Sequence, residues 1–298
     1  MELRVLRYFL AIVREESISK AAESLHLTQP TLSRQMMELE EELGIKLLNR
    51  GKKNRKVTLT DEGKLFRKRA EELVELADKM RSEFSAADGP VSGDIYIGGG
   101  ETEAMRLIAA AATELQRDYP HIRYHLFSGN AADVMERLDK GLLDFGILVG
   151  EADMTQYDYL PLPVTDVWGI LMRKDSPLAK KAAVSQKDLV SLPLILSQQS
   201  LFSNELSGWY GGTLGESNVA ATYNLIYNAA LMVSEGFGYA VTLDKLVNTS
   251  SSSELCFRPL TPRLEARLSI VWKKHRGFSK ATELFLQKLR CSIHPTES

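Results

Sequence analysis

Apolar residues recur at helical spacing along the first 25 residues of the chain. A first run has them at intervals of three, four and three, which predicts an amphipathic helix with one buried side: Leu3, Leu6, Leu10 and Val13. A second, shorter run ends near Leu25, and Ser17 or Ser19 can cap its start. Because Ala21 and Ala22 are small, we expect another helix to cross this second one closely.

A third helix is predicted from Thr28 to Leu43. Thr28 can cap it, because its hydroxyl accepts an unpaired backbone N–H, and Pro30 is tolerated in a first turn. Apolar residues at intervals of four, three and four define its buried face: Leu32, Met36, Leu39 and Leu43. The outward face carries Pro30, Thr31, Ser33, Arg34 and Met37. No carboxylate interrupts this outward face before Glu38, so it suits the major groove of DNA.

A basic hairpin is predicted directly after this helix, which Gly44 can end in a left-handed conformation. Two short strand-like runs, IKLLNR and KVTLT, lie on either side of GKKNR. Between Lys46 and Arg69 the chain has ten Lys and Arg residues against two acids, a local balance of +8. A basic run alone is usually a solvent-exposed face. After two helices joined by a short turn, such as those ending near Leu25 and beginning at Thr28, it is typical of a wing that contacts phosphates or the minor groove.

A long helix is predicted from Thr60 to about Ala87, where Asp88-Gly89-Pro90 ends it and begins a linker. Its apolar residues alternate at intervals of four and three: Phe66, Ala70, Leu73, Ala77, Met80 and Phe84. Such a seam joins helices of two chains or packs a helix on its own domain. We favour the seam between chains, because the segments on both sides look like complete domains. The resulting dimer would present two recognition helices together.

Strands and helices alternate after Val91, which argues for a mostly parallel α/β sheet. The expected strands are IYIGGG, HIRYHLF, LLDFGILVG, VWGILMRK, LPLILS, NVAATY, LCFRPL and RLSIVWKK. The expected helices are 102–118, 130–140, 204–209, 224–234, one near Leu243, and 279–290. Two α/β lobes joined by crossing strands would accommodate this count, with a ligand in the cleft between them.

Composition agrees with a globular protein of two or three domains. The 298 residues are 44 % hydrophobic and 26 % charged, with a net charge of −2 that gives no hint of a nucleic-acid partner. No apolar run reaches the roughly 18 residues that span a bilayer, and the N-terminus resembles a helix more than a signal peptide, so we expect a cytoplasmic protein. Cys256 and Cys291 form no CxxC pair, and two unpaired thiols are favoured over a redox switch.

No enzyme, cofactor or metal site is predicted. Gly98-Gly99-Gly100 follows a strand, but the third glycine of a dinucleotide-binding motif is replaced by the bulky Glu103. His121 and His125 lie on one side of a strand without a Cys or carboxylate at metal-binding spacing, so a surface strand is favoured. The chain contains no GxSxG and no HExxH sequence.

The first sixty residues resemble the LysR-type transcriptional regulators. The pattern SxAAxxLxxTQPxxSxxxxxLExxLGxxLxxR is carried by Ser19, Ala21, Ala22, Leu25, Thr28, Gln29, Pro30, Ser33, Leu39, Glu40, Leu43, Gly44, Leu47 and Arg50, and continues in Thr58-Leu59-Thr60 and Gly63. A weaker likeness follows in 93–98, Tyr119-Pro120, 141–147 and 235–240, so the resemblance covers essentially the whole chain.

This resemblance implies a bacterial regulator with three parts. They are a winged helix-turn-helix domain (1–60), a linker helix that dimerises (61–90), and a two-lobed domain of the periplasmic-binding-protein type (type 2), with lobe I in 91–163 and 268–298 and lobe II in 164–267. It also implies binding to promoter DNA as a dimer or tetramer, with RNA polymerase as a further candidate partner and no membrane partner. A small co-inducer between the lobes is expected to control DNA binding.

The resemblance also assigns candidate residues by position. The DNA-contacting set is Thr28, Gln29, Pro30, Thr31, Ser33 and Arg34 in the recognition helix and Arg50, Lys52, Lys53 and Arg55 at the wing. The co-inducer set is Gly100, Glu101 and Thr102 after one strand, Asn130 after the next, and Ser197, Gln198, Gln199 and Ser200 in the other lobe.

Two positions depart from the family pattern. The usual Leu-Phe of the wing is Leu47-Leu48, a conservative change in packing. Glu101 is unusual, because many members bind carboxylates with backbone amides and a hydroxyl at this helix start. A carboxylate lining the pocket would oppose an anion, which favours a neutral or cationic ligand. The alternative is that Glu101 only points to solvent.

We therefore predict a ligand-controlled, DNA-binding transcription regulator with a winged helix-turn-helix followed by an α/β domain. Wing cations supply affinity that does not depend on sequence, and the helix from Thr28 reads base edges. The alternative is a ligand-binding module whose DNA domain is vestigial.

Overall fold

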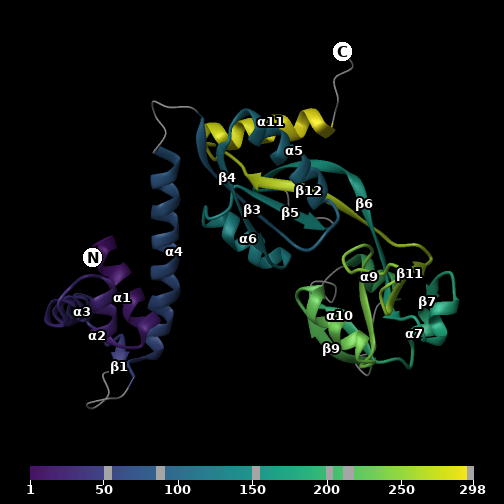
Figure 1. Cartoon of the computed structure of the whole chain (residues 1–298), viewed down its shortest axis with the longest axis horizontal. Coiled ribbons are helices and arrows are strands. Elements are labelled where there is room, and N and C mark those ends of the chain that lie inside the picture. Colours follow the sequence, from purple (N-terminus) through teal and green to yellow (C-terminus); the bar gives the residue numbers. More distant parts are fainter. Residues whose placement is uncertain (50–55, 85–90, 150–154, 199–203, 211–217, 294–298) are drawn as a thin grey trace. The chain divides into compact units, whose positions relative to one another are not determined.

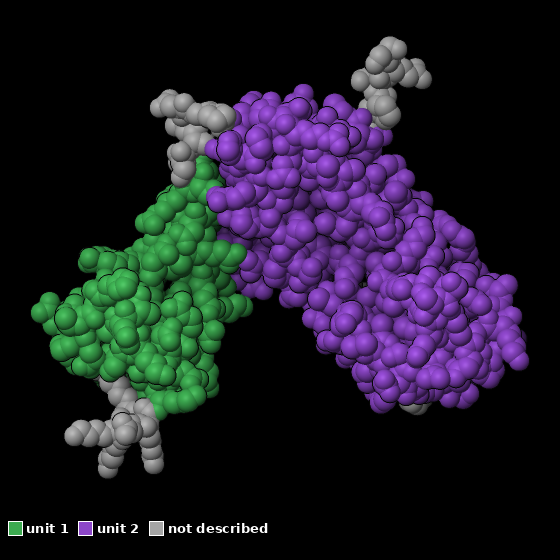
Figure 2. All heavy atoms as spheres, in the orientation of Figure 1, with its two compact units in different colours: residues 1–85 green, residues 86–298 purple. Residues whose placement is uncertain are grey.

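A computed structural model describes residues 1–49, 56–84, 91–149, 155–198, 204–210 and 218–293. The chain divides into two compact units, residues 1–85 and 86–298, shown in green and purple in Figure 2. Each unit has its own hydrophobic core. Among the described residues, no helix is both long enough and apolar enough to cross a membrane.

Unit 1 is a helical domain with a two-stranded hairpin (Figure 1). Its elements are α1 (Leu3–Glu15), α2 (Ile18–Ser24), α3 (Gln29–Leu43), β1 (Leu48–Asn49), β2 (Thr58–Leu59) and α4 (Asp61–Phe84). Ser17 caps α2, and Gly44 ends α3 with φ of 69°, which confirms the predicted boundaries. Ala21 and Ala22 are buried in the core that α1 and α3 share, as their small size predicted.

The base of the hairpin is tied to the start of α4. Thr60 Oγ1 accepts a hydrogen bond from the N of Gly63 at 2.9 Å and donates one to the carbonyl of Lys46 at 2.6 Å. A Cβ at Gly63 would lie 2.1 Å from the carbonyl oxygen of Leu47. Only glycine therefore lets the first turn of α4 approach the hairpin this closely.

The apolar side chains of α4 fall on two faces and not on one seam. Phe66 and Ala70 pack into the core of unit 1, where the Phe66 ring meets the Phe9 ring edge-on with centroids 5.0 Å apart. The predicted seam is therefore wrong at these two positions, which pack on the helix's own domain. A second, exposed stripe consists of Leu65, Leu73, Leu76 and Met80, whose exposed fractions range from 41 % to 63 %. These four residues are called the exposed α4 stripe below.

Unit 2 contains one mixed sheet that runs through two lobes. Its helices and strands are β3 (Ser92–Gly99), α5 (Met105–Asp118), β4 (His121–Ser128), α6 (Ala131–Asp139), β5 (Phe145–Val149), β6 (Tyr157–Arg173), η1 (Pro177–Lys180), β7 (Val184–Ser185), α7 (Gln186–Leu189), β8 (Leu194–Ser197), α9 (Asn204–Trp209), β9 (Val219–Tyr223), α10 (Ile226–Ser234), β10 (Tyr239–Leu243), β11 (Leu255–Thr261), β12 (Glu265–Lys273) and α11 (Lys280–Ile293). The strand order is β4-β3-β5-β12-β6-β10-β8-β9, with β11 and β7 branching from β6.

Two lobes are defined by separate cores on this sheet. In lobe I, α5 and α11 cover one face through residues such as Ile108 and Phe285, and α6 covers the other through Val134. In lobe II, α7 and α9 lie on one face, and α10 lies on the other. The antiparallel pair β6 and β12 runs from one lobe into the other, with Tyr157 opposite Lys273 and Val167 opposite Glu265 (Figure 1).

Most of the alternating pattern predicted after Val91 is confirmed, with two differences. The helix expected near Leu243 is wrong, because Leu243 ends strand β10, a buried strand between β6 and β8. The strand expected at VWGILMRK is the second half of β6, which begins ten residues earlier, at Tyr157, and contains two prolines. Pro161 is accommodated at a register shift of the β6–β12 ladder.

Candidate nucleic-acid interface and effector pocket

The start of α3 presents a small polar surface. Thr28 Oγ1 accepts a hydrogen bond from the N of Thr31 at 3.4 Å, which confirms the predicted cap, and lies 2.8 Å from Thr31 Oγ1. The side of α3 opposite its buried face is exposed at Gln29, Pro30, Thr31 and Arg34, whereas Ser33 is half-buried. Leu32, Met36 and Leu39 bury the inner face as predicted.

Arg34 lies beside the first carboxylate of this surface. Its Nε is 3.1 Å from Glu38 Oε1, one helical turn further on, and both side chains are more than half exposed. Glu38 Oε2 also accepts a hydrogen bond from Gln35 Nε2 at 2.8 Å. An exposed ion pair at this spacing contributes only about 0.3–0.5 kcal/mol. Glu38 therefore orients Arg34, and the Arg34 guanidinium can still donate a hydrogen bond to another acceptor.

Glu40 fixes the geometry between α3 and the hairpin. Its carboxyl group is almost completely buried, and Oε1 accepts hydrogen bonds from the N of Leu47 at 2.8 Å and of Leu48 at 3.1 Å. Oε2 lies 3.3 Å from Nζ of Lys46. The family motif includes Glu40, but sequence spacing alone gave it no role. In the structure it holds strand β1 against the recognition helix.

The predicted wing cations lie outside the described residues. These are Arg50, Lys52, Lys53 and Arg55, and their DNA contacts remain a prediction from the sequence. The strands on either side pair antiparallel, with Leu48 opposite Leu59 and Asn49 opposite Thr58. The hairpin itself is therefore confirmed.

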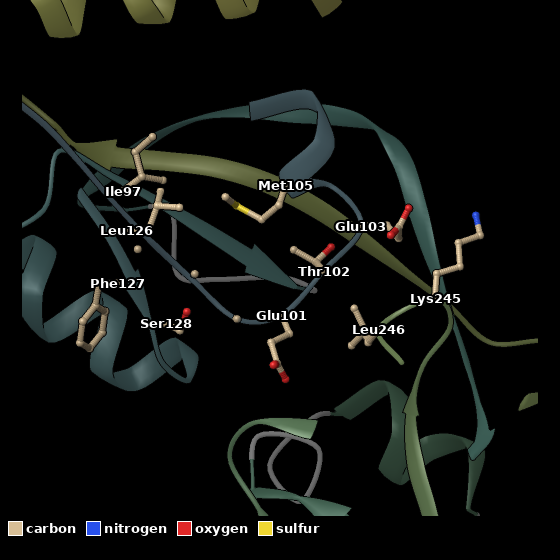
Figure 3. Close-up of a pocket in the computed structure, with 13 residues that line it drawn as sticks. Ile97, Glu101, Thr102, Glu103, Met105, Leu126, Phe127, Ser128, Lys245 and Leu246 are labelled. Carbon is tan, nitrogen blue, oxygen red and sulfur yellow. The ribbon is translucent and has the colours of Figure 1, made fainter. Parts of the chain in front are cut away.

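A pocket of about 310 Å³ opens beside the carboxyl end of β3, as Figure 3 shows. It is lined from lobe I by residues 97–103, Met105 and 126–128, and from lobe II by Lys245 and Leu246. Three of the predicted co-inducer residues, Gly100, Glu101 and Thr102, are brought together here. Glu103, Lys245 and Leu246 were not predicted, because nothing local to them in sequence marks a pocket.

The remaining co-inducer residues are placed elsewhere or lie outside the described chain. Asn130 caps α6, with its Oδ1 accepting a hydrogen bond from the N of Asp133 at 3.0 Å. Ser197 ends strand β8 and Gln198 follows it, and neither is among the described residues that line this pocket. Gln199 and Ser200 lie outside the described residues.

Glu101 does not point only to solvent, so that alternative is wrong. Its Oε2 accepts a hydrogen bond from the N of Ile226, in lobe II, at 2.5 Å. Figure 3 shows its carboxylate directed from lobe I toward the elements of lobe II. The side chain therefore lines the pocket and also joins its two sides.

Asp166 is a buried carboxyl group that sequence reasoning missed. It lies on β6 opposite Ala266, and its Oδ2 accepts a hydrogen bond from Thr102 Oγ1 at 2.5 Å. Burial raises the pKa of the Asp166 carboxyl, and the hydrogen bond from Thr102 opposes this effect. The Thr102 hydroxyl also accepts a hydrogen bond from the N of Ala104 at 3.1 Å, so the protein already uses both its donor and an acceptor position.

His125 has a carboxylate neighbour that sequence spacing could not reveal. Its Nε2 lies 2.9 Å from Oδ1 of the buried Asp94, on the adjacent strand, and Arg123 binds the same carboxylate with two hydrogen bonds. The His125 ring stacks on Tyr96 with centroids 4.5 Å apart. Within the described part of the chain, no group of three His, Cys, Asp or Glu side chains could hold a metal ion.

Together, the two units define a class of protein. A helix-turn-helix with a hairpin wing lies in the same chain as a two-lobed domain that has a pocket beside its crossing strands. This combination is that of a ligand-responsive DNA-binding regulator.

Comparisons with known proteins identify the family. Residues 3–64 match the model for the bacterial regulatory helix-turn-helix protein of the lysR family, and residues 88–292 match that for the LysR substrate binding domain. The chain belongs to the LysR family and is a DNA-binding transcriptional regulator with an effector-binding domain.

Relatives and solved structures agree over most of the chain. The HTH-type transcriptional regulator BsdA of Bacillus subtilis (strain 168) is 32 % identical over 201 residues, which are 66 % of this chain and 67 % of BsdA. YvbU of the same organism is 27 % identical over 290 residues, 96 % of this chain and 97 % of YvbU. The crystal structure of CbnR, a LysR family transcriptional regulator, has a TM-score of 0.78 at 20 % identity and covers 98 % of this chain and 99 % of CbnR. A structure of full-length CbnR complexed with its target DNA has a TM-score of 0.73 at 19 % identity, over 98 % of this chain and all of that one.

Replacing Glu40 should weaken unit 1 and its wing together. In Glu40→Gln, one amide oxygen replaces a carboxylate that accepts two backbone N–H groups, so unit 1 should lose about 1–3 kcal/mol of stability. Calorimetry of the full chain measures this loss, and DNA affinity should fall on all sequences alike. Glu41→Gln, at the exposed neighbouring position, is the matched control. Equal effects of the two substitutions would contradict the anchoring role.

Asp166→Asn should stabilise unit 2 near neutral pH. The raised pKa means that ionised Asp166 costs folding free energy at pH 7, whereas asparagine keeps an acceptor for Thr102 without a charge. The difference should shrink as the pH falls and vanish below about the ordinary value of 3.8, where the carboxyl is protonated in both states. Fluorescence-detected unfolding follows unit 2, because all three tryptophans lie in it. Asp158→Asn, exposed on the same strand, should change nothing; a variant less stable than its parent at pH 7 would refute the assignment.

Proposed function

We propose that α3 reads base edges in the major groove, while the wing contacts the DNA backbone. The observation that supports this most strongly is the outward face of α3, which is exposed at Gln29, Thr31 and Arg34 while the opposite face is buried. These side chains donate hydrogen bonds without adding a negative charge near phosphates. The fold is also that of CbnR, whose full-length structure was determined in complex with its target DNA.

A small effector is proposed to bind in the pocket beside Glu101. Two carboxyl groups, those of Glu101 and Glu103, and one lysine, Lys245, line this pocket. Asp166 lies beside it, bonded to Thr102. Arg106 pairs with Glu103, so Glu101 is the carboxylate most exposed to a ligand's charge. This charge distribution favours a neutral or cationic effector over a simple carboxylate. The apolar part of the lining, which includes Met105 and Leu126, would take the uncharged portion of such a molecule. We keep the division of unit 2 at 163/164 and 267/268 as the proposed boundary between the lobes.

Dimerisation is proposed to use the exposed α4 stripe, and tetramers would pair such dimers. Leu65, Leu73, Leu76 and Met80 share one side of α4 at 100° per residue, and Phe66 and Ala70 lie on the adjacent side against unit 1. Leu73 and Met80 belong to the seam predicted from the sequence, while Leu65 and Leu76 extend it. Four large apolar side chains on one exposed side are typical of a helix–helix interface.

Substitutions in α3 and in the wing should affect DNA binding in different ways. Gln29→Ala or Arg34→Ala should weaken specific binding by roughly 1–3 kcal/mol and relax the preference at one base pair, because a base-edge hydrogen bond is lost. Lys53→Ala should weaken binding to all sequences and flatten its salt dependence, because fewer counterions are released. A mobility-shift assay titrated with salt, together with a footprint, measures both effects. An unchanged footprint for Arg34→Ala would refute base reading, and equal salt slopes would refute the phosphate contact.

Leu76→Glu should shift the chain from dimer toward monomer. A charge in the middle of an apolar helix interface stays unpaired and desolvated, which costs several kcal/mol. Sedimentation velocity of the full chain measures the change, and DNA affinity should fall with it because two half-sites are no longer held together. Lys64→Glu also introduces an acid on α4 but on a different side, so it should leave the oligomer intact. Identical sedimentation of Leu76→Glu and its parent would exclude this stripe as the interface.

A further inference from the structure

The turn from Gly100 to Thr102 contacts both sides of the effector pocket. Glu101 Oε2 accepts a hydrogen bond from the N of Ile226 at 2.5 Å, although the two residues are 125 positions apart in the chain. Thr102 Oγ1 donates to Asp166 Oδ2 at 2.5 Å. Both contacts therefore reach residues of lobe II: Glu101 reaches the start of α10, and Thr102 reaches the crossing strand β6 close to the boundary between the lobes.

The N-terminus of α10 has no side-chain cap of its own. Leu225 occupies the capping position and offers no acceptor, and Asn224 Oδ1 accepts instead from the N of Leu225 at 3.0 Å. The first N–H groups of a helix have no partner within it, and the helix dipole favours a negative charge there. Glu101 supplies both the acceptor and the charge, from the other lobe.

Both ends of this contact are attached to well-packed elements. In α10, the side chains of Ile226, Ala229, Ala230 and Val233 are buried in the core of lobe II. On the other side, Thr102 is buried, and its hydroxyl accepts a hydrogen bond from the N of Ala104, which is fully buried in the core of lobe I. A movement of one lobe relative to the other therefore has to break the Glu101 contact, because neither partner can follow freely.

We propose that Glu101 is a positioning residue that latches the two lobes together over the pocket when no effector is bound. Its meaning for regulation rests on the proposed function, because an effector that enters the pocket must either accommodate this contact or replace it. The latch sets how far apart the pocket walls stand before binding. Part of the effector's binding free energy is needed to break or replace this contact, and only the remainder can change the arrangement of the lobes.

Hydrogen exchange of the full chain, without effector and without DNA, tests the latch. In Glu101→Ala, the amide of Ile226 should exchange about tenfold faster or more, because its charge-assisted hydrogen bond is lost. Glu101→Gln retains an acceptor without the charge, so its exchange should fall between parent and alanine variant. The buried strand β10 in the same lobe should keep its protection in both variants.

Glu103 offers a matched control in the same pocket. Its Oε2 pairs with Arg106 Nε at 2.8 Å within lobe I, so Glu103→Ala removes an equal charge without touching lobe II. This variant should leave the exchange of Ile226 unchanged. The latch is overturned if Glu101→Ala exchanges like the parent, if Glu103→Ala accelerates Ile226 equally, or if protection falls evenly through α10 and β10. None of these readouts involves DNA, so failure of the latch is distinguishable from failure of the proposed function.

Discussion

Unit 2 depends on the antiparallel ladder between β6 and β12. These two strands are the backbone connection on which both lobes are built, since each contributes residues to the core of lobe I and of lobe II. Leu162 and Leu268 belong to the first core, whereas Trp168 and Ala266 belong to the second. A paired ladder resists shear along its length but permits bending and twist. The geometry of the pocket is therefore governed by a few residues at the point where the two cores meet.

Asp166 lies at this meeting point, and through its hydrogen bond with Thr102 it contacts a residue that lines the pocket. A buried carboxyl group opposite Ala266, one pair from the lobe II end of the ladder, would be costly without the hydroxyl of Thr102. The same hydroxyl shapes the turn that carries Glu101. Polar contacts thus connect the ladder, the turn and the start of α10.

Local chemistry made much of the fold predictable. The Thr28 cap, the left-handed Gly44 and the buried face of α3 follow from residue type and spacing within one or two turns. The wrong helix near Leu243 and the missed first half of β6 have a different cause. Their residues form strands because they pair with residues far away in the sequence. In β6, two prolines also make the first half of the strand hard to predict. The error in the α4 seam is similar, because one heptad spacing suits packing on the same domain and packing on a partner equally well. The contacts Glu101–Ile226 and Asp94–His125 join residues that only the folded sheet brings together.

The closeness of Gly63 to the carbonyl oxygen of Leu47 has a mechanical consequence. With Thr60 bonded to Lys46 on one side and to Gly63 on the other, the hairpin and the first turn of α4 form a single stiff joint. The hairpin cannot swing independently of that helix. In a pair of chains joined through α4, the distance between the two hairpins would therefore be set by the angle at which the two α4 helices cross.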